Sequence, residues 1–132
     1  MSDRFTVIGK IVSGARQAAF FTQLDWVQEQ CEKKLGFKPF PGTLNLEISD
    51  KDIDLIKSLE DVETITLIPP DPKFCSARTL PVKIKGIQGA IVVPAEDVQI
   101  HAQNILEVIA PVFLKETLGL DDGDFVKIKI VR

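Results

Sequence analysis

The stretch that decides the fold is Thr43-Leu44-Asn45-Leu46-Glu47-Ile48, in which polar and apolar residues alternate strictly. Alternation with a period of two predicts a β-strand with one buried face, here the face of the two leucines and the isoleucine. The other face carries the threonine, the asparagine and the glutamate. The prolines Pro39 and Pro41 keep the preceding segment extended, so the chain enters this strand from a non-helical approach.

Patterns of the same kind recur on both sides of this strand. They predict further strands over residues 5–12, 63–68, 75–85, 89–93, 105–110 and 125–131. Helical spacing of apolar residues predicts helices near 23–35 and 51–59, and a short one near 111–119. Six or more short strands with two or three helices indicate a mostly β barrel with inserted helices.

The expected boundaries of these elements depend on short local signals. Thr22 and Asp25 form a variant of the capping box before the first helix. Ser49 is placed to cap the second helix, and Pro111 suits the first turn of the third. Residues 86–89 are expected to form a tight connection between strands.

The totals restrict the class of protein. A length of 132 residues fits one domain, taken as residues 1–132, with 45% hydrophobic and 27% charged residues. The apolar runs are far shorter than the roughly 20 residues of a membrane helix, and no signal peptide is recognisable. Two cysteines and one histidine exclude a zinc site and fit a reduced compartment. We therefore expect a cytoplasmic monomer that does not associate with membranes.

The charge pattern argues against nucleic acid as a partner. The formal net charge is -3, and the lysines are scattered among acidic residues. A nucleic-acid-binding domain usually concentrates basic residues on one face. The single histidine also argues against Ser-His-Asp catalysis.

Thr43 and Asn45 are the first candidate site. Two residues apart on a strand, their side chains point to the same side, with Cα atoms about 6.5–7 Å apart. A hydroxyl and an amide oxygen can then converge on one Mg²⁺ ion, which accepts oxygen ligands and is often completed by substrate phosphates. From spacing alone, a solvated strand face remains the more common case.

Three weaker features accompany this pair. The loop 14–20 is built mainly of small residues and includes Arg16, which suits contact with a phosphate, although an ordinary loop is the more common case. The helix opening at Pro111 has free N–H groups that suit an anion or only water. Glu107 interrupts an apolar run, where it can bind a polar ligand or activate a hydroxyl, or simply face solvent from an edge strand.

Three longer motifs carry a resemblance to a known family. They are Leu35-Gly36-Phe37-Lys38-Pro39-Phe40-Pro41-Gly42-Thr43-Leu44-Asn45-Leu46, then Gly89-Ala90-Ile91-Val92-Val93-Pro94, then Glu107-Val108-Ile109-Ala110-Pro111. Leu114 and the turn Leu120-Asp121-Asp122-Gly123-Asp124 follow. In this order and at this spacing, the chain resembles the archaeal-type CTP-dependent riboflavin kinases over nearly its whole length.

The resemblance implies a fold and a reaction. The fold is a six-stranded cradle-loop barrel of the RIFT type with two or three short inserted helices. The reaction is transfer of the CTP γ-phosphate to the ribityl 5'-hydroxyl of riboflavin, giving FMN and CDP. The implied partners are therefore a nucleoside triphosphate and riboflavin, with Mg²⁺ as cofactor.

The resemblance also assigns site residues. It implies that Thr43 and Asn45 ligate Mg²⁺, that Glu107 and a residue near Gln99 contact the flavin, and that Glu107 is the best candidate to orient the acceptor hydroxyl. The implied nucleotide-binding residues are Gly14, Ala15, Arg16, Gln17, Ala18, Ala19, Phe20, Val112, Phe113, Leu114 and Lys115.

Two other functions stay open at this level. Only Gly14 remains of a loop that is usually richer in glycine in the resembled family, which fits a non-catalytic sensor barrel that binds CTP or flavin. The turn 120–124 followed by a strand also occurs in DNA-binding barrels of the swapped-hairpin type, which the net negative charge disfavours.

Overall fold

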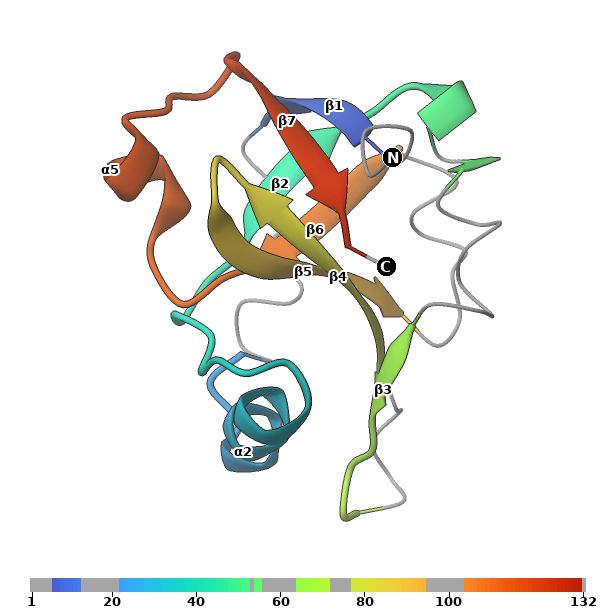
Figure 1. The fold of residues 1–132 in the computed structure, drawn as a ribbon, viewed down its shortest axis with the longest axis vertical. Coiled ribbons are helices and arrows are strands. Elements are labelled where there is room, and N and C mark those ends of the chain that lie inside the picture. The colour runs from blue at the N-terminus through green and yellow to red at the C-terminus, as the bar shows by residue number, and fades with distance from the viewer. Residues whose placement is uncertain are drawn as a thin grey trace.

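A computed structural model of the chain describes residues 6–12, 22–52, 54–55, 64–71, 77–94 and 104–131 (Figure 1). Its strands and helices follow the predicted order, with boundaries shifted by a few residues. The strands are β1 (Thr6–Ile11), β2 (Leu44–Glu47), β3 (Ile65–Leu67), β4 (Ala77–Ile84), β5 (Ile87–Pro94), β6 (Ile105–Ile109) and β7 (Phe125–Ile130). The helices are α2 (Asp25–Lys34) and α5 (Leu114–Leu118).

Six of the strands close into an antiparallel barrel. The sheet order is β3-β4-β5-β6-β2-β1-β7, and an additional pairing of β4 with β7 joins the two ends. Strand β3 stays outside the ring, paired with β4 alone. The predicted mostly β, six-stranded barrel with short inserted helices is confirmed.

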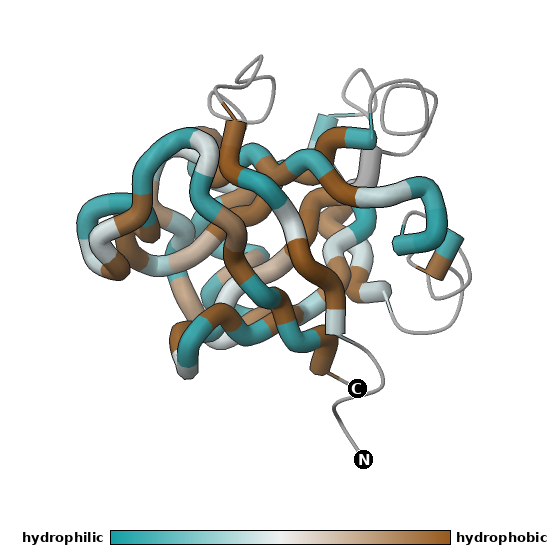
Figure 2. Tube along the Cα trace, turned by 90° about the horizontal axis from the view of Figure 1, so that it is seen from above, coloured by the Kyte–Doolittle hydropathy of each residue, from teal (hydrophilic) through white to brown (hydrophobic). Residues whose placement is uncertain are grey.

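The barrel interior is filled by alternate residues of its strands. Along β7, Val126, Ile128 and Ile130 are buried while the residues between them are exposed, as the alternating sequence predicts. On β2 the inward residues are Leu44 and Leu46. Figure 2 shows the corresponding alternation of hydrophilic and hydrophobic positions along the chain.

A second apolar layer lies outside the barrel, under helix α2. Val27 and Cys31 from the helix pack with Leu67 of β3 and with Ala90 and Ile109. The last two come from β5 and β6, which therefore bury residues on both faces. Helix α2 consequently anchors the segment that leads from it into β2.

Three local predictions are corrected by the structure. Helix α2 begins at Asp25 after Leu24, which makes no side-chain cap, and the Thr22 hydroxyl accepts a hydrogen bond from the N–H of Gly42 instead. The tight turn before β5 consists of Lys85 and Gly86, since β5 already begins at Ile87. Pro111 lies three residues before α5, which begins at Leu114.

Other local predictions are confirmed. Residues 50–52 and 54–55 are helical, and the Ser49 hydroxyl accepts a hydrogen bond from the N–H of Asp52 at 3.2 Å. Gly119 ends α5 in the left-handed conformation. Within the described ranges, no helix has the length and apolar character needed to cross a membrane.

Candidate functional site

The polar residues of β2 and β6 meet on the outer face of the barrel. Asn45 and Glu107 are direct partners in the antiparallel pairing of these strands. Thr43, one residue before β2, is diagonal to Glu107, a separation of about 7–8 Å between Cα atoms that a long side chain can span. Its hydroxyl donates a hydrogen bond to Glu107 Oε1 at 3.0 Å. Thr43, Asn45 and Glu107 therefore form one polar cluster, called here the β2–β6 cluster.

Asn45 is the unusual member of this cluster. Its side chain is buried, with 6% of the residue exposed, and its Oδ1 has no hydrogen-bond partner among the described residues. An unpaired buried acceptor costs about 1–3 kcal/mol, so such an atom calls for an explanation. A bound cation supplies one, because an amide oxygen is a ligand for hard cations.

The segment that brings Thr43 into place is fixed from two sides. The Gln28 side-chain amide donates to the carbonyls of Thr22 and Pro39, at 2.6 and 2.9 Å. The Thr22 hydroxyl accepts from the N–H of Gly42 at 3.0 Å. Gly42 has a φ of +135°, a backbone conformation that residues other than glycine rarely adopt. Helix α2 thus sets the entry of the chain into β2.

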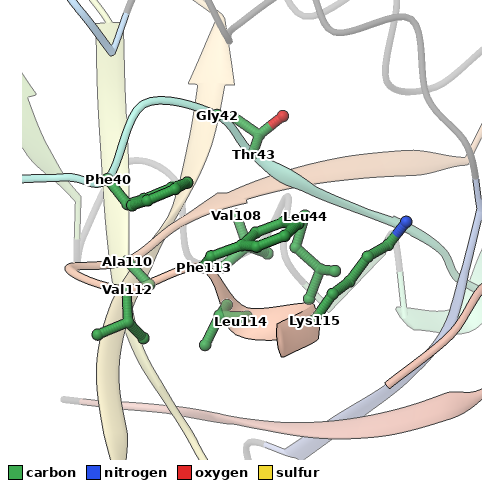
Figure 3. A pocket seen from close by; sticks show the side chains of 10 residues that line it. All are labelled: Phe40, Gly42, Thr43, Leu44, Val108, Ala110, Val112, Phe113, Leu114 and Lys115. Carbon is green, nitrogen blue, oxygen red and sulfur yellow. The ribbon is translucent and has the colours of Figure 1, made fainter. Parts of the chain in front are cut away.

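A pocket lies beside the cluster, between the segment before β2 and the segment that leads into α5 (Figure 3). It holds about 260 Å³ of empty space, open solvent included. The rings of Phe40 and Phe113 stack across it, with centroids 5.5 Å apart and 12° between planes, and both are exposed. Thr43 belongs to its lining as well as to the β2–β6 cluster. The pocket is therefore contiguous with the polar cluster.

Charge at this pocket comes from Lys115. Its ammonium lies 2.6 Å from Asp122 Oδ1, in the turn before β7. This contact orients the ammonium but does not remove it from solvent, because a third of the lysine side chain remains exposed. An anionic group entering the pocket would meet an ammonium already held in place, whose charge the Asp122 carboxylate partly offsets.

The structure thus brings together most of the predicted site residues that it describes. Thr43, Asn45 and Glu107 share one cluster, and the segment 112–115 lines the adjoining pocket. The predicted nucleotide loop, Gly14 to Phe20, and the flavin-loop residue Gln99 lie outside the described residues.

Three residues of the site were missed by sequence reasoning. Phe40 lines the pocket, while Thr22 and Gln28 hold the segment before β2. Gln28 offered a signal, because it lies four residues after Leu24 and three before Cys31, on the helix face that these apolar residues share. Thr22 offered a misleading one, since its position before the helix fits a capping residue.

The β2–β6 cluster offers a hydroxyl, an amide oxygen and one carboxylate as possible oxygen ligands for a metal. The described part of the chain holds no group of three or more His, Cys, Asp or Glu residues able to bind a metal. A cation at the β2–β6 cluster would use the Thr43 hydroxyl and the Asn45 amide, and would need further oxygens from water or from a ligand. The thiol of Cys31, whose pKa burial raises to about 11, lies apart from this cluster, beneath α2.

Comparison with known proteins identifies the family. The model of the family named CTP-dep_RFKase, described as domain of unknown function DUF120, matches residues 11–130. A riboflavin kinase of Thermococcus kodakarensis is 38% identical over 128 residues, covering 96% of this chain and 59% of the relative. A riboflavin kinase of Archaeoglobus fulgidus is 36% identical over 126 residues, covering 93% of this chain and 53% of the relative.

The chain therefore spans little more than half the length of these curated relatives. The match nevertheless includes the β2–β6 cluster, the pocket and the barrel strands β2, β4, β5, β6 and β7, all of which fall within residues 11–130. Of β1 it covers only the last residue, Ile11. The chain belongs to the CTP-dependent riboflavin kinase domain family.

Proposed function

We propose that this domain transfers the γ-phosphate of CTP to the ribityl 5'-hydroxyl of riboflavin, giving FMN and CDP. The observation that carries the proposal is the buried Asn45 Oδ1 without a partner in the described structure, placed across from Glu107 and beside Thr43. Membership of the family supports the choice of donor and acceptor. In the reaction the bond from Pγ to the oxygen that links it to Pβ breaks and this oxygen leaves with CDP, a bond from Pγ to the riboflavin oxygen forms, and the hydroxyl proton passes to water.

Mg²⁺ is the proposed cofactor, and the residues present fit it. Thr43 and Asn45 would hold it through a hydroxyl and an amide oxygen, one of which is buried without another described partner. When bound, the ion would neutralise charge on the phosphate oxygens. The protein's own contribution is to fix these two oxygens, through the strand pairing of β2 and the hydrogen bonds before it.

We propose that the nucleotide occupies the pocket next to this cluster. Phe40 and Phe113 offer aromatic surface for a base, and Val112, Leu114 and Lys115 complete the wall. The ammonium of Lys115 would attract the phosphates. The residues 14–20, with Arg16, are proposed to contact the nucleotide as well.

The acceptor would lie against Glu107, with Gln99 as a second proposed flavin contact. A carboxylate at the end of the polar cluster can accept a hydrogen bond from the ribityl hydroxyl and orient its oxygen toward the phosphate. Phosphoryl transfer needs mainly positioning and charge neutralisation, so no strong base is required.

The test is incubation of the purified protein with riboflavin, Mg²⁺ and each of CTP, ATP, GTP and UTP, with FMN read by chromatography. Formation of FMN with CTP, and much less with the other donors, is the expected result. Flavin binding without product for any donor would replace the proposal by the non-catalytic sensor. FMN from ATP alone would overturn the donor assignment while keeping the kinase.

We also propose that the domain works as a monomer in the cytoplasm, with no nucleic acid or membrane as partner. Light scattering is expected to give the mass of a single chain. Binding to duplex DNA that weakens steeply with salt would contradict this part of the proposal.

A further inference from the structure

We infer that Glu107 is a positioning residue for the metal ligand Thr43, in addition to any contact it makes with the acceptor. Its carboxylate holds the Thr43 hydroxyl so that the hydroxyl oxygen is presented to a cation beside Asn45. The inference rests on the proposed function, because it concerns the same metal site.

The direction of the hydrogen bond carries the first step. The Thr43 hydroxyl lies 3.0 Å from Glu107 Oε1. An ionised carboxylate only accepts hydrogen bonds, so the hydroxyl proton must point at Glu107. Both lone pairs of the Thr43 oxygen are then directed elsewhere. A hydroxyl without such an acceptor rotates, and in part of its orientations its proton would face the cation.

The strand register carries the second step. Asn45 and Glu107 are opposite each other across β2 and β6, and Thr43 precedes Asn45 by two residues on the same side. The acceptor for the Thr43 proton and the second ligand oxygen therefore lie next to each other. Asn45 is buried, at 6% exposure, while Thr43 and Glu107 are half-buried, so the hydrogen bond between them is partly shielded from bulk water. Partial shielding strengthens a hydrogen bond to a charged group.

The backbone supplies the third step. The N–H of Gly42 is held by the Thr22 hydroxyl, and Thr22 is held by Gln28 of α2. The position of the Thr43 backbone is thus fixed independently of Glu107. Loss of the Glu107 carboxylate should leave the strand in place while it frees the Thr43 hydroxyl to rotate, and the barrel should stay folded, which separates a positioning role from a structural one.

A link between two subsites follows from this arrangement. If the acceptor hydroxyl also contacts Glu107, its binding changes how the carboxylate holds Thr43, and metal affinity changes with it. Linkage requires that the metal change flavin affinity by the same factor. Glu107 would then connect the metal and the acceptor through one hydrogen bond.

The test is a double-mutant cycle on metal binding, without turnover. Mn²⁺ is titrated into the protein with CDP present, and bound Mn²⁺ is followed by electron paramagnetic resonance. Glu107→Ala should weaken Mn²⁺ binding by about tenfold or more, the equivalent of one hydrogen bond to a charged group. Glu107→Gln, which keeps an acceptor oxygen, should stay within about threefold of the wild type. In a Thr43→Val background, Glu107→Ala should change Mn²⁺ affinity by less than about twofold.

Each outcome decides between explanations. Glu107→Ala would overturn the inference if it weakened Mn²⁺ binding equally in the wild-type and Thr43→Val backgrounds, since Glu107 would then act by charge alone. Equal effects of Glu107→Gln and Glu107→Ala on Mn²⁺ binding would also overturn it. Thr43→Ser is the second background, where the hydroxyl remains and the full effect of Glu107→Ala should return. If the wild-type protein binds no Mn²⁺ with CDP, the proposed metal site itself is wrong. Thermal melts of all variants check that the barrel is folded.

Discussion

Strand β2 buries residues on both of its faces, but for different reasons. Leu44 and Leu46 point into the barrel and belong to its apolar core. Asn45, between them, points outward, and it is also buried, with an oxygen that no described residue satisfies. Burial of the leucines is explained by folding alone. Burial of the amide oxygen opposes folding, so the outer face of the strand is better explained by binding.

The largest expected effect is on the inner face. Leu46→Ala should lower the free energy of unfolding by about 2–5 kcal/mol, because it opens a cavity in the closed barrel core. Leu46 is fully buried, and its Cβ already lies close to the position that a Cβ on Gly9 would take, so the site has few ways to collapse. Urea unfolding followed by circular dichroism measures the change. A loss below about 1 kcal/mol would contradict the tight core described here.

On the outer face, a substitution should reduce activity and leave stability intact. Asn45→Ala should reduce FMN formation by at least about 100-fold, since the proposed metal loses a ligand. The free energy of unfolding should stay equal or rise, because a buried unsatisfied acceptor is removed. The assay is the CTP reaction with saturating Mg²⁺, beside urea unfolding of the same protein.

The matched control for this variant is Glu47→Ala, on the same face two residues further along β2 and exposed. It should change neither rate nor stability measurably. Turnover at the wild-type rate in purified Asn45→Ala protein would show that the metal assignment is wrong.

The difference between the two faces also explains what the sequence could predict. The inner face follows from alternation, which places Leu44, Leu46 and, on β7, Val126 correctly without any knowledge of neighbours. The pairing of Asn45 with Glu107 involves residues 62 positions apart in the chain. No local pattern encodes that register, and the two residues came into one hypothesis only through the family resemblance.

The errors in prediction have the same origin. Thr22 has the right type and position for a helix cap, yet its hydroxyl accepts from Gly42, 20 residues away. Pro111 suits a first helical turn, but the helix begins after Phe113, whose ring stacks on Phe40. In both cases a tertiary contact near the pocket replaces the local interaction that the sequence suggested.

An intermediate loss of stability is expected for a substitution that displaces the backbone of β6, because this strand contributes to both the barrel core and the β2–β6 cluster. A Cβ on Gly89 of β5 would lie 2.7 Å from the carbonyl oxygen of Ile109, on the neighbouring strand β6. Gly89→Ala should therefore cost about 1–3 kcal/mol of stability. It should also slow FMN formation, because Ile109 is two residues from Glu107.

Gly86→Ala is the control for this variant, in the turn between β4 and β5. Its φ of +84° makes an added Cβ unfavourable by about 1–2 kcal/mol, while the surrounding space is open. A comparable loss of stability with an unchanged rate is expected. Equal loss of activity in both variants would show that the Gly89 effect is general destabilisation rather than displacement of β6.

The smallest effect concerns Cys31, in the apolar layer between α2 and the outer face of β5 and β6. Burial raises its pKa from 9.0 to about 11, so between these values the folded protein keeps a proton that the unfolded chain releases. Stability from this thiol is complete below pH 9 and declines as the pH rises toward 11. In a Cys75→Ser background, the difference in unfolding free energy between Cys31 and Cys31→Ala proteins should therefore narrow from pH 8 to pH 10.5. A difference in unfolding free energy that stays constant over this pH range would mean that water reaches Cys31 in the apolar layer under α2. The outer face of the barrel would then be less well shielded from solvent than the inner face.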